Sequence, residues 1–344
     1  MSRPAPWSLA RGLCNVEGPT VGPDGWILNV NSLSRPEQPD WPTRGGDITA
    51  THPRRPHDTR ILLTTSTDQV DGIPAALAFG PDGALYICDE GRRSVVRVDP
   101  DGTITDFISE WRGERLNGPN DLSFDQAGNL YFTDPWQSSP RNPAAAVYGY
   151  DWNSGELTRI DAGLQFTNGI IARGGRLLVA ETYPRQVWAY DLTGGGRAGR
   201  RQEFCTLPDV PDAPRLEASV RAALGVDHVC GPDGMACDAD GRVYVAHYGS
   251  GAVYVYDPGG READRIAVPG VNPTNVCFGG DRHDQLFVAV DDIGEIVVFD
   301  LGITGDRISW CPSGFGQHPW RPRLPARPGR TAAAGQKPPG GGAL

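Results

Sequence analysis

One short pattern recurs six times along this chain and constrains its fold more than any other feature. Each copy consists of a short apolar run, a turn that contains Gly or Asp, and a second apolar run, which is the signature of a β-hairpin. In the third copy, Leu122-Ser123-Phe124 and Leu130-Tyr131-Phe132 flank a turn at Gly128. Most copies are followed by a third strand that ends in Asp, such as Ser94 to Asp99.

Six such units, each with room for a fourth edge strand, predict an all-β chain that folds as a six-bladed β-propeller. A large β-sandwich would explain the strands, but it would not explain six copies in the same register. The 45 Gly and 31 Pro residues suit a chain with this many turns. We expect the propeller domain to occupy residues 1–311, and the Pro-, Gly- and Arg-rich segment 312–344 to be a disordered tail.

Two segments interrupt the repeat. We interpret Ser32 to Arg60 as a long polar insertion in the first blade. Between the fourth and fifth blades lies a second insertion, Pro208 to Val229, in which Ala213 to Gly225 has the Pro and Gly signals of a short helix. Near the end of the ring, part of Ile303 to Trp310 is a candidate for the closing edge strand.

Composition excludes several classes of partner. A net charge of −10 argues against nucleic acid and against anionic membranes. No apolar run approaches the roughly 18 residues of a membrane-spanning helix, and Met1 to Leu13 lacks the apolar core of a secretory signal. The seven cysteines show no C-x-x-C spacing, which favours a reduced chain. We expect a cytoplasmic protein, a monomer or weak dimer, that acts on a small-molecule substrate.

The residue that opens the first strand changes from unit to unit. In a propeller these strands line the central channel, so their opening residues ring one mouth of it. In chain order this column reads Glu17, Ala75, Asn120, Asn168, Asp233 and Thr274. Carboxylate and amide oxygens are the ligands of a hard divalent cation, and two carboxylates balance its charge. We therefore predict a central metal site made by Glu17, Asn120, Asn168 and Asp233. The alternative, a general preference of Asn and Asp for strand entries, predicts them scattered over all turns instead.

The second strand of each unit returns to the same mouth, so its last residues should surround the metal site. They include Asp89 and Glu90, Glu181 to Tyr183, and His247 and Tyr248. From this rim and the column we predict the substrate contacts Asn120, Asp121, Glu181 and His247. Each also has a plain interpretation as a polar residue at a strand end, and His247 is equally suited to a structural role.

These residues resemble motifs of the SMP-30/gluconolactonase family of six-bladed propellers. Four segments carry the resemblance, which covers about residues 10–302. They are Glu17-Gly18-Pro19, Leu116 to Asp121 with Leu130 to Pro135, Phe166 to Ile170 with Val179 to Thr182, and Gly231 to Met235. The resemblance implies one divalent cation, commonly Ca²⁺ and in some members Zn²⁺, Mg²⁺, Mn²⁺ or Fe²⁺. It further implies that Glu17, Asn168 and Asp233 bind the metal, that Asn120 contacts the metal or the substrate, and that Asp233 is the general base.

Two positions depart from the family pattern. Gly118 stands where the mammalian-type members have an Arg two residues before Asn120, and Trp136 to Pro140 replaces a run that is often aromatic. Both departures argue against a simple sugar lactone as the substrate.

The prediction for function is a metal-dependent carboxylic ester hydrolase, and specifically a gluconolactonase-like lactonase. The cation would polarise the ester carbonyl while Asp233 takes a proton from the attacking water. One alternative is a phosphotriesterase, although those relatives carry a His near the sixth strand entry, where this chain has Cys277. The other is a non-hydrolytic propeller, either a binding module or a strictosidine-synthase-like condensing enzyme, which would not need the four-oxygen column.

Overall fold

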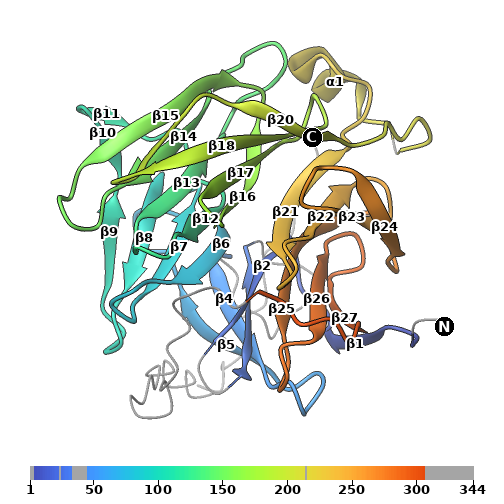
Figure 1. Ribbon diagram of the computed structural model, residues 1–344. Helices are drawn as coiled ribbons and strands as arrows, with labels where there is room; N and C mark the ends of the chain where they lie inside the picture. Colours follow the sequence, from blue (N-terminus) through green and yellow to red (C-terminus); the bar gives the residue numbers. More distant parts are fainter. Residues whose placement is uncertain (1–3, 23–24, 33–44, 214, 307–344) are drawn as a thin grey trace, which may run out of the picture.

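The computed structural model describes residues 4–22, 25–32, 45–213 and 215–306. These residues form six antiparallel sheets arranged in a ring, which confirms the predicted six-bladed β-propeller (Figure 1). The predicted tail 312–344 lies outside the described residues. No helix in the described part of the chain is both long and apolar enough to cross a membrane.

Each blade is a meander whose first strand lies innermost. The first three blades are β2 (Val16–Val21), β3 (Ile27–Asn31), β4 (Asp47–Thr51) and β5 (Thr59–Thr64); β6 (Pro74–Phe79), β7 (Leu85–Asp89), β8 (Ser94–Val98) and β9 (Ile104–Ile108); and β12 (Leu122–Phe124), β13 (Leu130–Asp134), β14 (Ala145–Tyr150) and β15 (Leu157–Leu164). The fourth and fifth are β16 (Thr167–Arg173), β17 (Arg176–Glu181), β18 (Gln186–Gly194), β19 (Arg197–Ala198) and β20 (Gln202–Thr206); and β21 (Gly231–Cys237), β22 (Val243–Tyr248), β23 (Ala252–Tyr256) and β24 (Glu262–Ala267). The sixth combines β25 (Pro273–Gly279), β26 (Gln285–Val290) and β27 (Glu295–Asp300) with β1 (Trp7–Ala10). A small hairpin, β10 (Glu110–Trp111) and β11 (Glu114–Arg115), and the helix α1 (Ala218–Leu224) lie outside the blades.

The ring is closed by the N-terminal strand. β1 pairs with β27 in antiparallel register, with Trp7 opposite Val298. Leu9 and Ala10 on this strand are fully buried. The outer strand of the sixth blade is therefore β1, and the described residues 303–306 do not take this place. The rest of the candidate segment, 307–310, lies outside the described residues. The repeat could not reveal β1, because this strand precedes the first complete copy.

The polar segment Ser32 to Arg60 is also only in part an insertion, because it contains β4 and the start of β5. Every residue of β4 is buried, including its three polar side chains. The Thr49 hydroxyl donates to the Asn29 carbonyl (3.4 Å), and the hydroxyls of Thr51 and Thr59 lie 2.9 Å apart. These side-chain partners let a polar sequence form a buried strand.

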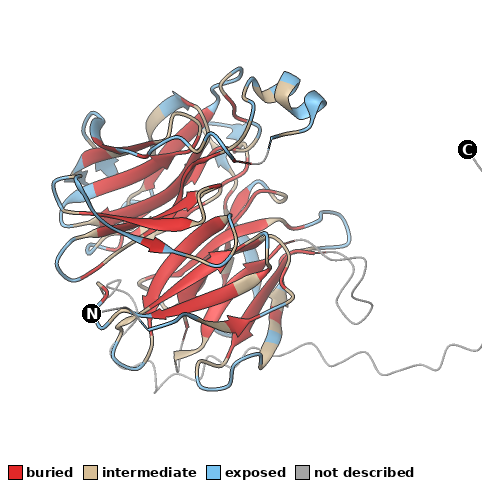
Figure 2. Ribbon diagram, turned by 90° about the vertical axis from the view of Figure 1, so that its right-hand side faces the viewer, coloured by how far each residue is buried: buried red, intermediate tan, exposed pale blue. Residues whose placement is uncertain are grey.

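The predicted helix in the second insertion is present but shorter than expected. α1 begins at Ala218 rather than near Pro214, and it ends at Gly225, which adopts the left-handed conformation that terminates helices. Figure 2 shows the blades as largely buried ribbons, whereas α1 is exposed at the edge of the molecule.

The core lies between adjacent blades. Between the second and third blades, the Tyr86 ring meets those of Phe124 and Trp152 edge to face, with centroids 5.4 and 5.9 Å apart. Such aromatic contacts join sheets that share no backbone hydrogen bonds. Burial between blades thus holds the ring together and fixes the positions of the innermost strands.

Closure by β1 predicts that Leu9→Ala destabilises the whole ring. Deleting this fully buried side chain should lower the free energy of unfolding by about 2–5 kcal/mol, because it leaves a cavity between β1 and its neighbours. Urea unfolding would measure the loss. Val70→Ala, at a position that is 40% exposed, is the control and should change little. Equal effects of the two substitutions would contradict closure through β1.

Candidate active site

Three of the four predicted ligands lie where the innermost strands are bulged. In β16, Thr167 pairs with Glu181 and Ile170 pairs with Val179, so one residue is extra around Asn168. The same shift occurs in β21 around Asp233 and in β2 just after Glu17. A bulge releases a residue from the regular alternation and redirects its side chain. The repeat therefore places Glu17, Asn168 and Asp233 at points where the strand can turn a side chain toward the mouth of the channel, whereas Asn120 precedes the regular strand β12.

A glycine follows three of the four predicted ligands, and close approach of neighbouring strands explains why. A Cβ atom on Gly169 would lie 2.3 Å from the carbonyl oxygen of Asp233, in the next blade. A Cβ on Gly18 would lie 2.7 Å from the Cα of Ala76, also in the next blade. Only glycine lets these strands approach so closely. In each of the pairs Glu17-Gly18, Asn168-Gly169 and Asp233-Gly234, a predicted oxygen ligand is thus followed by a glycine that lets the neighbouring blade approach.

Carboxylates from different blades interact electrostatically at this mouth. Burial, and next the neighbouring Asp233 carboxylate, raise the pKa of Glu17 well above its ordinary value. Burial and the carboxylates of Asp121 and Asp291 raise the pKa of Asp233 in the same way. Burial also raises the pKa of Asp121 to about 7. Burial and nearby carboxylates thus destabilise the ionised forms of Glu17 and Asp233, and a positive charge beside them would relieve this effect.

The two asparagines turn their amide nitrogens away from this group. The Asn120 Nδ2 donates to Glu90 Oε1 (2.9 Å), and the Asn168 Nδ2 donates to the Thr182 hydroxyl (3.3 Å). Thr182 in turn donates to the Pro232 carbonyl (2.9 Å), next to Asp233. Among the described residues, neither Asn Oδ1 accepts a hydrogen bond. Each asparagine is therefore oriented by its nitrogen and keeps its carbonyl oxygen as an available donor for a cation.

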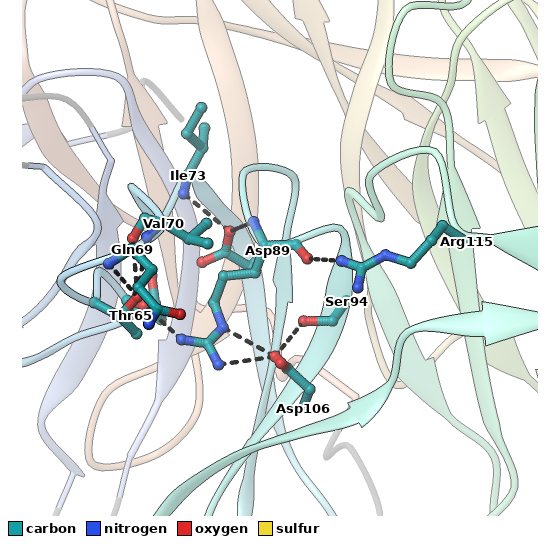
Figure 3. A network of polar contacts seen from close by, with 10 residues as sticks. Thr65, Gln69, Val70, Ile73, Asp89, Ser94, Asp106 and Arg115 are labelled. Atoms are coloured by element: carbon teal, nitrogen blue, oxygen red, sulfur yellow. Dashed lines mark hydrogen bonds and ion pairs between the residues drawn. The ribbon is translucent and has the colours of Figure 1, made fainter.

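Glu90 is a site residue that the column did not reveal. Its side chain is 7% exposed, and burial raises its pKa to about 8 despite the hydrogen bond from Asn120. The turn that carries it is anchored by Asp89, whose Oδ1 accepts from the amides of Ile73 (3.0 Å) and Arg92 (2.8 Å). Figure 3 shows this network, which continues through Asp106. Glu90 follows the strand end at the rim, but only the structure shows that it faces Asn120.

A pocket of about 340 Å³ opens above Asn168 and Asp233. Its other lining residues are Phe166, Thr182, Tyr183, Arg215, Leu216, Val229, Tyr248 and Asn272. Burial, with the carboxylates of Asp291 and Asp233, raises the pKa of Tyr248 to about 12. Tyr248 therefore remains a phenol at neutral pH and can donate a hydrogen bond beside Asp233. The volume suits a small organic molecule.

None of the four predicted substrate contacts, Asn120, Asp121, Glu181 and His247, is among the described residues that line this pocket. Asp121 accepts from the amides of Leu122 (2.7 Å) and Ile170 (3.1 Å), which ties the third blade to the fourth. It also lines a second cavity of about 500 Å³, which extends along the innermost strands from the positions of Gly18 and Asp121. Glu181 accepts from the Trp188 indole (2.6 Å). His247 is 0% exposed, and its ring lies 4.9 Å from that of Tyr254. Their substrate-binding roles stay predictions.

The departure at Gly118 has a structural counterpart. A Cβ at this position would lie 2.7 Å from the Cβ of Trp136, the first residue of the other departing segment. An Arg at position 118 would therefore collide with Trp136. The two departures from the family pattern therefore lie next to each other in the structure.

A second group of potential metal donors lies at the base of the insertion. Ligand atoms of Asp209, His228 and Cys230 all lie within 4.8 Å of one another. The His228 Nε2 and the Cys230 Sγ lie 3.2 and 3.3 Å from Asp209 Oδ1. Arg185 Nη1 lies 3.5 Å from the same oxygen. This guanidinium already supplies the positive charge that Asp209 would draw from a cation, so the group is well suited to hold the ends of the insertion together.

The sequence profile of the SMP-30/Gluconolactonase/LRE-like region matches residues 45–291. The chain belongs to this family. Diisopropyl-fluorophosphatase of Loligo vulgaris is 29% identical over 234 residues, which cover 63% of this chain and 69% of that protein. Gluconolactonase of Zymomonas mobilis is 28% identical over 227 residues, which cover 62% of this chain and 59% of that protein.

Comparison with a solved structure supports the fold. The calcium-binding protein regucalcin of Agrobacterium tumefaciens superimposes with a TM-score of 0.68 at 20% identity. The match covers 88% of this chain and 95% of that chain. At this identity the similarity establishes the shared propeller architecture.

The close contact at Gly169 predicts that Gly169→Ala destabilises the site. Its Cβ would push against the Asp233 carbonyl, and such overpacking should lower the free energy of unfolding by about 1–3 kcal/mol. Thermal or urea unfolding would measure this change. Gly199→Ala is the matched control, because its Cβ would meet only Asp191 O at an ordinary 3.7 Å. A Gly169→Ala protein as stable as the control would show that these strands do not approach as described.

Burial of His247 predicts a pH-dependent stability. Burial, and then the Arg185 and Arg265 cations, lower the pKa of His247 to about 4, whereas Asp209 opposes the shift. The unfolded chain, with a His pKa of about 6.5, binds this proton more tightly. The contribution of His247 is therefore complete above pH 6.5 and is lost as the pH falls toward 4, up to on the order of 3 kcal/mol.

Urea unfolding of the wild type and of His247→Leu between pH 7.5 and 4.5 would test this expectation. The leucine variant should lose less stability on acidification than the wild type. His57→Asn, at an exposed left-handed position that Asn tolerates, is the control and should follow the wild type. Identical pH profiles of all three proteins would argue against a buried neutral His247.

Proposed function

We propose that this protein is a divalent-metal-dependent hydrolase that opens lactone rings. The observation that carries the proposal is the convergence of the Glu17 and Asp233 carboxylates, from the first and fifth blades, with two asparagines whose amide nitrogens are bound elsewhere. The names of two curated relatives, a gluconolactonase and a diisopropyl-fluorophosphatase, support hydrolysis as the class of reaction. The name of the regucalcin structure supports calcium as the first ion to test.

Glu17, Asn120, Asn168 and Asp233 would hold the cation. This donor set, with two carboxylates and two neutral carbonyl oxygens, fits a hard dication such as Ca²⁺. The raised pKa values of Glu17 and Asp233 show that their ionised forms are destabilised, and a bound cation would stabilise them. When bound, the ion would supply Lewis acidity to the ester carbonyl.

Asp233 lines the pocket and is the residue suited to move a proton. We assign it to accept a proton from the water that attacks the lactone carbonyl carbon. The ring C–O bond then breaks, and Asp233 returns the proton to the alkoxide, so that the product is a hydroxy acid. Tyr248, which remains protonated, is placed to donate a hydrogen bond to substrate oxygen in the same pocket.

Phosphotriester hydrolysis is the second candidate, because the similarity to diisopropyl-fluorophosphatase favours it specifically. Cys277, which stands where the sequence comparison expected a His in such enzymes, is buried and lines the second cavity rather than the pocket above Asp233. Organophosphates therefore belong in the substrate screen as the competing class.

Chelator treatment tests the metal dependence. Lactone hydrolysis should be lost after EDTA and buffer exchange, and it should return when Ca²⁺ is added. Other divalent ions tested in parallel would identify which ion supports the fastest turnover. If protein that elemental analysis shows to be metal-free kept full activity, the proposal would be contradicted.

Asp233→Asn distinguishes the role of Asp233 as a metal ligand from its role as the general base. The amide keeps a carbonyl oxygen for the ion but removes the proton acceptor, so kcat at saturating metal should fall by about 10² to 10⁴-fold. Asn168→Asp, which alters the ligand set in the neighbouring blade and leaves Asp233 intact, should retain more activity. Near wild-type kcat in metal-saturated Asp233→Asn would remove the base role from this residue.

A further inference from the structure

The pocket above Asp233 has a polar floor and an apolar wall. Asn168, Thr182 and Asp233 form the floor. The polar side chains of Arg215 and Asn272 also line the pocket. The other five lining side chains have large apolar surfaces and come from three separate parts of the chain. They are Phe166, Tyr183, Leu216, Val229 and Tyr248. A ligand whose reacting group lies on the floor must place its remaining atoms against this wall.

The insertion between the fourth and fifth blades supplies part of the wall. Its helix α1 has no buried residue, so it adds nothing to the core. Leu216, just before the helix, is nevertheless held in place. Its amide donates to the Asp227 carbonyl (2.9 Å), and its carbonyl accepts from Arg221 Nη1 (3.3 Å). The insertion therefore presents Leu216 to the pocket without any role in packing the blades.

The base of the insertion is equally well held, and this fixes Val229. The residues on either side of Val229, His228 and Cys230, both contact Asp209 at the start of the insertion. The two ends of the insertion are thus joined beside the pocket. Leu216 and Val229 form a fixed apolar surface opposite the blades.

The aromatic part of the wall is also held in an unusual conformation. Phe166 has φ +67°, a left-handed conformation that is uncommon for a bulky residue. Its ring contacts Tyr183 edge to face, with centroids 6.1 Å apart. Backbone strain of this kind persists where the surrounding structure requires the side chain in one place. Here that place is the wall of the pocket.

The one full charge on the wall is already balanced. Arg215 Nη2 lies 3.2 Å from Asp227 Oδ1, and both side chains are largely exposed. No unpaired cation therefore remains on the wall to attract an anionic substituent. Hydroxyl groups placed against Phe166, Leu216 and Val229 would lose water without gaining partners, which is unfavourable. An alkyl or aryl group in the same place would gain from burial.

We propose that this pocket selects lactones that carry an uncharged alkyl or aryl substituent next to the ring, rather than polyhydroxylated sugar lactones. Leu216 and Val229 are the specificity-determining residues that the insertion contributes. The proposal rests on the lactonase function proposed above. It concerns only which lactones the enzyme prefers.

A homologous series of substrates tests the preference. For metal-loaded enzyme, kcat/KM should rise from γ-butyrolactone through γ-hexalactone to γ-nonalactone by about two- to fourfold per methylene until the wall is covered. δ-Gluconolactone should be a poorer substrate than γ-nonalactone. A flat series, or a preference for the sugar lactone, would overturn the proposal while leaving the lactonase function intact.

A pair of variants tests whether the insertion contributes to the substrate preference. Leu216→Ala should lower the ratio of kcat/KM for γ-nonalactone to that for γ-butyrolactone by about five- to twentyfold. Val220→Ala, which shortens an exposed side chain on α1 outside the pocket, should leave this ratio at the wild-type value. An unchanged ratio in Leu216→Ala would overturn the assignment of the wall.

Binding separates this proposal from the proposed function. Calorimetry with 5-pentyl-2-pyrrolidinone and 2-pyrrolidinone, two lactams that resist hydrolysis, measures how much contact with the wall adds to the binding affinity in the absence of turnover. The pentyl lactam should bind more tightly to the wild type, and the gain should shrink in Leu216→Ala. No hydrolysis of any lactone would refute the proposed function alone, whereas equal affinity for the two lactams would refute the apolar selection.

Discussion

The close approach of the innermost strands around the channel is the constraint on which the site depends. Burial between the blades draws these strands inward, and glycines at positions such as Gly18 and Gly169 let backbone meet backbone. The same contact brings Asp233 next to the fourth blade, and the Asp233 carboxylate is near enough to Glu17 to raise the pKa of that residue. Packing energy thus maintains an arrangement of charges that would be unfavourable without a counter-ion.

The neighbours of the column residues determine what the column can bind. Glu90 and Thr182 each accept a hydrogen bond from an asparagine Nδ2, so the carbonyl oxygens of Asn120 and Asn168 are left for another ligand. An asparagine free to rotate would present nitrogen as readily as oxygen. In the cation site proposed here, residues outside the column would therefore orient its ligands, as outer contacts commonly do at metal sites.

Much of this arrangement could be predicted from the sequence, because a repeat in register implies equivalent positions in space. That logic identified the six blades and brought Asn168 and Asp233 to one pocket. It failed for residues that lie outside the repeat and for residues whose contacts depend on the direction of the side chain. β1 precedes the repeat, and the direction of Glu181 toward Trp188 cannot be read from its place at a strand end. The apolar wall was equally hidden, because the insertion follows no repeat.

We propose that residues from separate blades form one cation site at the mouth of the channel. Calorimetric titration of Ca²⁺ into chelator-stripped protein tests this proposal most directly. We expect one ion per wild-type chain, loss of this binding in Glu17→Gln, and retention in Asp209→Asn, since Asp209 belongs to the separate group at the base of the insertion. Absence of binding to the wild type, or binding that survives Glu17→Gln and disappears in Asp209→Asn, would contradict it.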